Sequence, residues 1–154
     1  MPSPSDAVVQ ELLDRAHIRD VILRYARGID RREWELVAAC FVPGAMTDYL
    51  FVPPAPIEQV IPAIRDALTR FASTMHTMGN QLIDLTGDCA RSETYAICYH
   101  RIDGAPEPQL FTVGMKYFDE LARDANRWRI SKRAVTFEWQ TTAPLGAPPR
   151  TVAR

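Results

Sequence analysis

The sequence lacks the features that mark several large classes of protein. Its formal net charge of -1 leaves no surplus of Lys and Arg for a nucleic-acid backbone or an anionic membrane surface. Its three cysteines, Cys40, Cys89 and Cys98, form no C-x-x-C pair, and their odd number argues against a secreted disulfide framework. The first residues show neither a basic start nor an apolar run. We therefore expect a cytoplasmic protein with reduced, buried thiols that binds neither nucleic acid nor membrane.

Cofactor and nucleophile motifs are missing as well. The chain has no G-x-G-x-x-G, no Walker loop, no G-x-S-x-G and no H-E-x-x-H. Its three histidines, His17, His76 and His100, are scattered and have few acids nearby, which disfavours a metal site. His17 lies between charged neighbours in a helical stretch, so we expect it at the surface. A pocket that works without a cofactor or metal is the site type that remains.

What is present is the composition of an ordinary soluble domain. The chain has 154 residues, of which 47% are hydrophobic and 24% charged. This length can bury a substantial core without disulfides or metals. We expect a single domain over residues 1–154, with a core of about 7–140 and a Pro-rich C-terminal arm over 141–154.

The first half of the chain has helical periodicity. Apolar residues at helical spacing predict about two helical segments across 6–28, ended by Gly28, and a short helix that carries Trp34, Val37 and Phe41. Pro43 and Gly44 should stop that helix, and a short strand should follow over 45–52. A further helix is expected down to about residue 74, with Pro62 in its first turn.

The second half alternates with a period of two. Strands are expected at about 76–86, 89–102, 109–121 and 128–140, separated by turns rich in Gly, Asp and Asn. Helices followed by an antiparallel meander indicate an α+β fold in which one curved sheet wraps the helices.

Two strand faces suggest a pocket. In the strand over 89–102, one face carries only small residues until His100, a pattern that fits either close helix packing or room for a ligand. In the last strand, alternation gives Arg133 the same face as Val135, Phe137 and Trp139. A charge on that apolar face needs a partner, unless the side chain extends to the rim or a bulge turns it outward.

Asp30 and His76 are the candidates for acid–base chemistry. Asp30 also fits a helix N-cap with Glu33 three residues later, and a lone histidine at a helix-to-strand junction is more often a packed or capping residue. Together, a buried carboxylate beside an imidazole would make a general base suited to neutral pH. Tyr25 and Tyr49 could donate hydrogen bonds to a substrate, or could be core residues with satisfied hydroxyls.

Several stretches carry a resemblance to a known family. They are the run from Ile18 through Tyr25 and Asp30 to Trp34, His76 with Gly79-Asn80, Tyr99-His100, and Trp128 to Arg133. In these the chain resembles the SnoaL-like branch of the nuclear-transport-factor-two superfamily, including its scytalone dehydratases, hexachlorocyclohexane dehydrochlorinases and bile-acid dehydratases.

The resemblance implies a cone-shaped α+β barrel whose N-terminal helices pack in the concave face of a strongly curved, mostly antiparallel sheet. It implies catalytic roles for Asp30, His76 and Arg133, and substrate-binding roles for Tyr25, Tyr49 and His100. It departs from the dehydratase pattern at Ile29, where those enzymes have a tyrosine. Tyr25, which stands where the dehydrochlorinase has a lysine, is like the bile-acid dehydratases.

These observations lead to three hypotheses for function. The first is a cofactor-independent lyase, of the dehydratase type, or an isomerase that acts on a small hydrophobic or cyclic substrate. The second is a non-catalytic binding or assembly module of the same fold. The third is a polyketide cyclase or epoxide hydrolase that uses Asp30. We also expect a homo-oligomer, a dimer or trimer, because the outer sheet face carries Tyr95, Ile97 and Tyr99.

Overall fold

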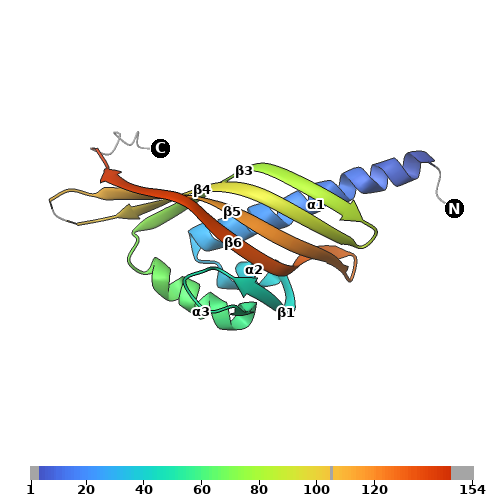
Figure 1. Ribbon diagram of the computed structural model, residues 1–154, viewed down its shortest axis with the longest axis horizontal. Coiled ribbons are helices and arrows are strands. Elements are labelled where there is room, and N and C mark those ends of the chain that lie inside the picture. Colours follow the sequence, from blue (N-terminus) through green and yellow to red (C-terminus); the bar gives the residue numbers. More distant parts are fainter. Residues whose placement is uncertain (1–3, 105, 147–154) are drawn as a thin grey trace, which may run out of the picture.

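One six-stranded sheet forms the body of the protein and the helices lie on one side of it (Figure 1). The computed structural model describes residues 4–104 and 106–146. The strand order is β2-β1-β6-β5-β4-β3, with β1 parallel to β6 and every other pair antiparallel. The sheet is curved and not closed, so the α+β class is confirmed and the architecture is an open, strongly bent sheet.

The first helix is a single element. α1 (Pro4–Arg31) runs without a break, where two segments ending at Gly28 were predicted from the sequence. A Cβ on Gly28 would lie 2.8 Å from Cγ2 of Val37, so the glycine allows α2 (Trp34–Ala39) to pack closely against α1. The reversal between the two helices occurs at Arg32, whose φ is +61°. Gly28 therefore serves close helix contact and does not end the helix.

The segment after α2 differs from the prediction in its boundaries. Phe41 begins β1 (Phe41–Asp48), which includes Pro43 and Gly44 and takes the place of the strand predicted over 45–52. An irregularity in the pairing with β6, between Phe41 and Met46, accommodates these two residues. β2 (Ala55–Pro56) is short, and α3 (Ile57–Leu68) follows it. Pro62 lies inside α3 on its exposed side, and not in the first turn.

The meander was predicted more closely. Its strands are β3 (Ser73–Thr86), β4 (Cys89–Ile102), β5 (Gln109–Asp124) and β6 (Arg127–Pro144). β6 continues four residues beyond the predicted end, because residues 141–144 of the expected arm pair with the beginning of β5. Residues 147–154 lie outside the described residues. A register shift at Glu138 turns Trp139 to the outer face, across Gly114, so Trp139 does not share the inner face of Arg133.

The core lies between the helices and the inner face of the sheet. Asp14 of α1 fastens the long helix to the sheet, since its carboxylate accepts hydrogen bonds from Trp128 Nε1 at 2.9 Å and Arg123 Nη2 at 2.7 Å. Cys40 and Cys98 are buried as expected, but Cys89 is exposed at the beginning of β4. None of the helices in the described part of the chain is long and apolar enough to cross a membrane.

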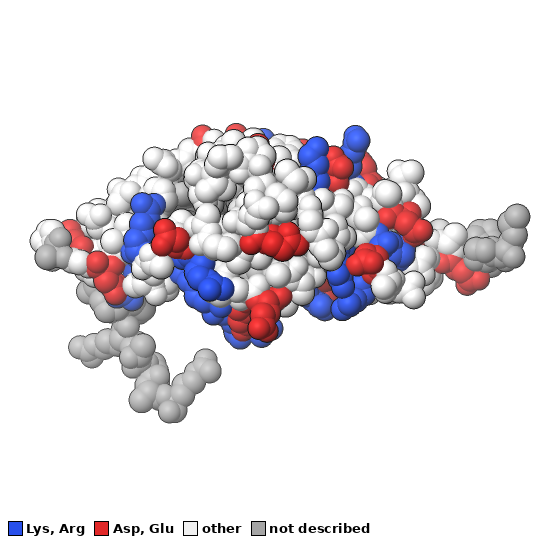
Figure 2. All heavy atoms as spheres, turned by 90° about the horizontal axis from the view of Figure 1, so that it is seen from below, with Lys and Arg blue, Asp and Glu red and all other residues white. Residues whose placement is uncertain are grey.

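Charges of both signs are interspersed on the surface. On the face seen from below in Figure 2, the side that carries α3 and β1 in Figure 1, basic and acidic side chains lie next to one another in small groups. This face also carries large uncharged areas between those groups.

Candidate active site

Asp30 is held at the end of α1 by three hydrogen bonds. Its Oδ1 accepts from Thr74 Oγ1 at 2.9 Å and contacts Nδ1 of His76 at 2.7 Å, while its Oδ2 accepts from the backbone N–H of His76 at 2.9 Å. Arg32 donates in turn to Thr74 Oγ1 at 2.9 Å. Glu33 occupies the N-cap position of α2, so the capping-box interpretation of Asp30 is wrong. The Asp30 carboxylate thus binds residues of β3 and links this strand to the end of α1.

The pair has the electrostatics of a partly buried ion pair. Burial alone would raise the pKa of Asp30, but hydrogen bonds from His76 and Thr74 outweigh burial and lower it. Burial alone would lower the pKa of His76, but the hydrogen bond to Asp30 and the contact with Cys98 raise it to about 9. The His76 side chain is only 7% exposed. Because Nδ1 is occupied by Asp30, Nε2 is the ring nitrogen available for other chemistry.

His76 lines an open cavity of about 610 Å³. The walls come from α1, the segment after β1, the C-terminal end of α3 with the residues that follow it, and the inner face of β3, β4, β5 and β6. They are predominantly apolar and aromatic, with residues that include Ile29, Ile64, Phe71, Phe111, Val113 and Val135. This size and lining suit a small organic molecule. In the described part of the chain, no three or more His, Cys, Asp or Glu side chains come together as metal ligands.

His100 faces the same cavity from the end of β4. Its ring lies 4.5 Å from the ring of Phe71, 5.5 Å from that of Phe111 and 5.8 Å from that of His76, measured between centroids. Burial, together with the positive charge on His76, lowers the pKa of His100 to about 4. Its Nδ1 is buried and has no hydrogen-bond partner among the described residues. His100 is thus a neutral imidazole beside a charged one.

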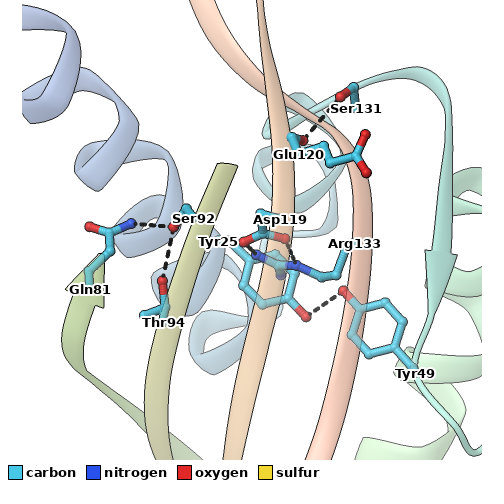
Figure 3. Close-up of polar contacts among 9 residues, drawn as sticks. All are labelled: Tyr25, Tyr49, Gln81, Ser92, Thr94, Asp119, Glu120, Ser131 and Arg133. Carbon is cyan, nitrogen blue, oxygen red and sulfur yellow. Dashed lines mark hydrogen bonds and ion pairs between the residues drawn. The ribbon is translucent and has the colours of Figure 1, made fainter. Parts of the chain in front are cut away.

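Tyr25 and Tyr49 form a hydroxyl pair on another part of the wall (Figure 3). The Tyr49 hydroxyl donates to the Tyr25 oxygen at 2.9 Å. Burial raises the pKa of both phenols, so both remain neutral hydrogen-bond donors. Since Tyr25 accepts from Tyr49, its own hydrogen is available for an oxygen in the cavity.

Arg133 points inward, but it lies behind the cavity wall. Figure 3 shows it beside the tyrosine pair, bound to Asp119 of β5 through two contacts, Nε–Oδ1 at 2.7 Å and Nη2–Oδ2 at 2.8 Å. Both side chains are fully buried. The guanidinium carbon also lies 4.1 Å from the ring centroid of Tyr25 and 4.5 Å from that of Tyr117. Arg133 itself does not line the cavity, and it can affect the cavity only through the tyrosines that it contacts, Tyr25 and Tyr117.

The row of small residues on β4 mostly serves packing. Ala90, Ser92, Thr94, Ala96 and Cys98 are all buried, and none of them lines the cavity. The Ser92 and Thr94 hydroxyls lie 3.3 Å apart, and Ser92 Oγ accepts a hydrogen bond from Gln81 Nε2 of β3 at 3.0 Å (Figure 3). Only His100, at the end of the row, reaches the cavity.

Comparison with known families agrees with this fold. The family model of the SnoaL-like domain matches residues 10–134 of the sequence, a stretch that includes Asp30, His76, His100 and Arg133. The chain belongs to the SnoaL-like domain family. An uncharacterized protein of Mycobacterium tuberculosis is 29% identical over 133 residues, which cover 83% of this chain and 88% of that one.

Solved structures of the same architecture include proteins with named activities. A hexachlorocyclohexane dehydrochlorinase from Novosphingobium barchaimii superimposes with a TM-score of 0.78 at 19% identity, covering 92% of this chain and 99% of that one. A candidate scytalone dehydratase from Novosphingobium aromaticivorans gives a TM-score of 0.77 at 19% identity, with the same coverage. At these identities the likeness establishes the fold, and the resemblance inferred from the sequence is confirmed at that level.

Several residues around the site were not predicted from the sequence. Asp119 lies on the inner face of β5 among apolar neighbours, so the alternation argument applied to Arg133 would also have found it. Phe71 and Phe111 stack with each other at 6.0 Å and cover His100, and no local pattern distinguishes them from ordinary core residues. Thr74 and Arg32 meet across 42 positions in the sequence, a contact that only the fold reveals.

Proposed function

We propose that this protein is a cofactor-independent lyase, of the dehydratase type, or an isomerase that acts on a small hydrophobic or cyclic substrate. The observation that carries the proposal is the 2.7 Å contact between Asp30 Oδ1 and Nδ1 of His76, with the imidazole at the wall of an apolar cavity. A carboxylate that holds one ring nitrogen fixes the tautomer and stabilises the imidazolium that forms when the other nitrogen takes a proton.

The proton transfer follows from this geometry. In the neutral form of His76, Nδ1–H donates to Asp30 and Nε2 removes a proton from a carbon adjacent to a carbonyl group. The resulting imidazolium then returns the proton, either to a leaving hydroxyl group, which departs as water, or to a different carbon of the substrate. Tyr25, a neutral donor whose hydroxyl accepts from Tyr49, would stabilise the oxyanion that develops on the carbonyl.

Arg133 has an indirect role in this proposal. Its guanidinium is bound to Asp119 and lies over the Tyr25 ring at 4.1 Å, so its positive charge acts on the phenol and not on the substrate. We therefore treat Arg133 as a positioning residue for the tyrosine pair. His100, as a neutral imidazole, would hydrogen-bond the substrate or its leaving group.

Deuterium exchange tests the proposal before the substrate is identified. Wild-type protein would be incubated in heavy water with a panel of cyclic ketones and β-hydroxy carbonyl compounds, and uptake at the α-carbon and loss of water would be followed. We expect exchange by wild type and a decrease of about 100-fold or more in His76→Gln. His17→Gln, which changes an exposed histidine of α1, is the matched control and should retain full activity.

The pH profile sharpens the test. Because the pKa of His76 is about 9, the neutral base is a minor species at pH 7, and the exchange rate should rise with pH until about 9. A rate that falls over this range would contradict the base assignment. If no protein exchanges any compound that it binds, the proposal fails and the non-catalytic binding module takes its place.

We also propose that the protein associates with further copies of itself through the outer face of the sheet. Large apolar side chains are exposed on that face, among them Tyr95 (42%), Ile97 (37%) and Trp139 (50%). A contiguous apolar surface of this kind is typical of an interface. Light scattering after size-exclusion chromatography should give the mass of a dimer or trimer, and a monomer at micromolar concentrations would contradict the proposal.

A further inference from the structure

A positively charged side chain, that of Arg70, lies at the mouth of the cavity. Arg70, which follows the C-terminal end of α3, is the only Lys or Arg among the described residues that line the cavity. Its guanidinium carbon lies 4.6 Å from the ring centroid of Phe71 and 5.9 Å from that of Phe111. The side chain is exposed, so its charged end is accessible from both solvent and cavity.

Arg70 differs from many arginines of this protein in its neighbours. Arg123 and Arg133, for example, are bound to aspartates at 2.7 Å, whereas no Asp or Glu within residues 4–104 and 106–146 forms an ion pair with Arg70. Aromatic rings hold a guanidinium by its face and leave its N–H groups directed outward. Those groups match the two oxygens of a carboxylate, which is the geometry of a bidentate pair.

The rings beneath Arg70 lead to the proposed proton-transfer pair. Phe71 and Phe111 are the two rings that pack on His100, and the ring of His100 lies 5.8 Å from that of His76. Arg70 therefore stands at the outer end of an aromatic row whose inner end is His76. A flat molecule that lies along this row can place an anionic group at Arg70 and its ring system near the imidazole.

We propose that Arg70 selects substrates that carry a carboxylate, and that the substrate class is a small cyclic organic acid. This inference rests on the proposed function for its use in catalysis, but its binding test does not. One guanidinium balances a single negative charge, which fits a carboxylate better than a doubly charged phosphate. Asp66 also lies at the mouth, so its negative charge opposes the binding of an anion and partly offsets Arg70.

A matched pair of ligands isolates the role of Arg70. Calorimetry at pH 7.5 would compare naphthalene-2-carboxylate with the neutral naphthalene-2-carboxamide, which has nearly the same shape. Arg70→Gln should weaken carboxylate binding by about 5- to 20-fold and carboxamide binding by less than about 2-fold. Arg65→Gln is the control, because Arg65 lies on α3, shortly before Arg70, and also covers an aromatic ring, that of Trp34 at 5.2 Å, outside the cavity lining.

Two further variants test whether carboxylate binding follows the sign of the charge at the mouth of the cavity. Asp66→Asn should strengthen carboxylate binding, and Arg70→Lys should restore part of what Arg70→Gln loses, since it keeps the charge without the planar fork. An unchanged carboxylate-to-carboxamide ratio in Arg70→Gln would overturn the proposal. His76 is the same in all these variants, so its charge cancels from the comparison. A carboxylate preference without deuterium exchange would leave this inference standing and refute the proposed catalysis.

Discussion

Replacing Asp30 by Asn should destabilise the protein in a way that depends on pH. A pKa of His76 raised from its ordinary 6.5 to about 9 corresponds to roughly 3 kcal/mol of stability from the charged pair. Because the folded-state pKa is the higher one, this contribution is fully present below pH 6.5 and is lost as the pH rises through 9. The lowered pKa of Asp30 sets the other limit, since its contribution is lost as the pH falls below the ordinary value of 3.8.

The pH range in which both Asp30 and His76 are charged sets the expected differences in the free energy of unfolding. Urea unfolding at pH 5.5 should give a free energy of unfolding about 3 kcal/mol lower in Asp30→Asn than in wild type, and at pH 10 the difference should shrink to about 1 kcal/mol or less. Asp20→Asn is the matched control, because Asp20 lies on the same helix in an exposed ion pair 3.7 Å from Arg24. It should change stability by less than about 0.5 kcal/mol at either pH.

Nuclear magnetic resonance provides the direct measurement. The ring signals of His76 should titrate near pH 9 in wild type and at or below 6.5 in Asp30→Asn, where burial is no longer opposed by the carboxylate. The reasoning is refuted if His76 titrates near 6.5 in the wild type, or if the substitution costs the same free energy at both pH values.

Three other outcomes are expected. His100 should stay neutral until about pH 4, and its ring signals should titrate there, because burial and the charge on His76 lower its pKa; titration near 6.5 would contradict this. Asp119→Asn should lower the free energy of unfolding in urea by about 3–5 kcal/mol, because it leaves Arg133 buried without its counter-charge. Asp119→Leu combined with Arg133→Met should recover most of that loss. An equally unstable double variant would argue against the explanation. Gly28→Ala should destabilise by about 1–3 kcal/mol despite the better helix propensity of alanine, because its Cβ would lie 2.8 Å from Val37; thermal unfolding at or above the wild-type temperature would show that this contact relaxes.

The strands were easier to predict than the helices for a physical reason. β4 was predicted with its observed boundaries, because strict alternation is a local signal and turn residues stand at both of its ends. Gly28 and the Pro43-Gly44 pair were misread as helix ends, since their roles depend on contacts with α2 and β6 that no local pattern records. Gly and Pro predict a helix end wrongly where an element distant in the sequence needs the same residue for packing or pairing.

The site was predictable only in part. The family resemblance pointed to both Asp30 and His76, but their spacing of 46 residues could not establish the contact at 2.7 Å. The orientation of Arg133 depends on its partner, Asp119, which lies on the neighbouring strand 14 positions earlier in the sequence. The position of Arg70 at the cavity mouth depends on where α3 ends against the sheet, which periodicity does not specify.

The buried Arg133–Asp119 pair has a consequence for how the chain avoids wrong structures. It lies on β5 and β6 between two irregularities in their pairing, at Ser131 and Glu138. A slip of one residue would turn Arg133 toward the outer face and leave Asp119 alone in the core, which costs several kcal/mol. The pair can therefore add little net stability and still exclude the misaligned sheets in which the tyrosines, and with them the cavity wall, would be lost.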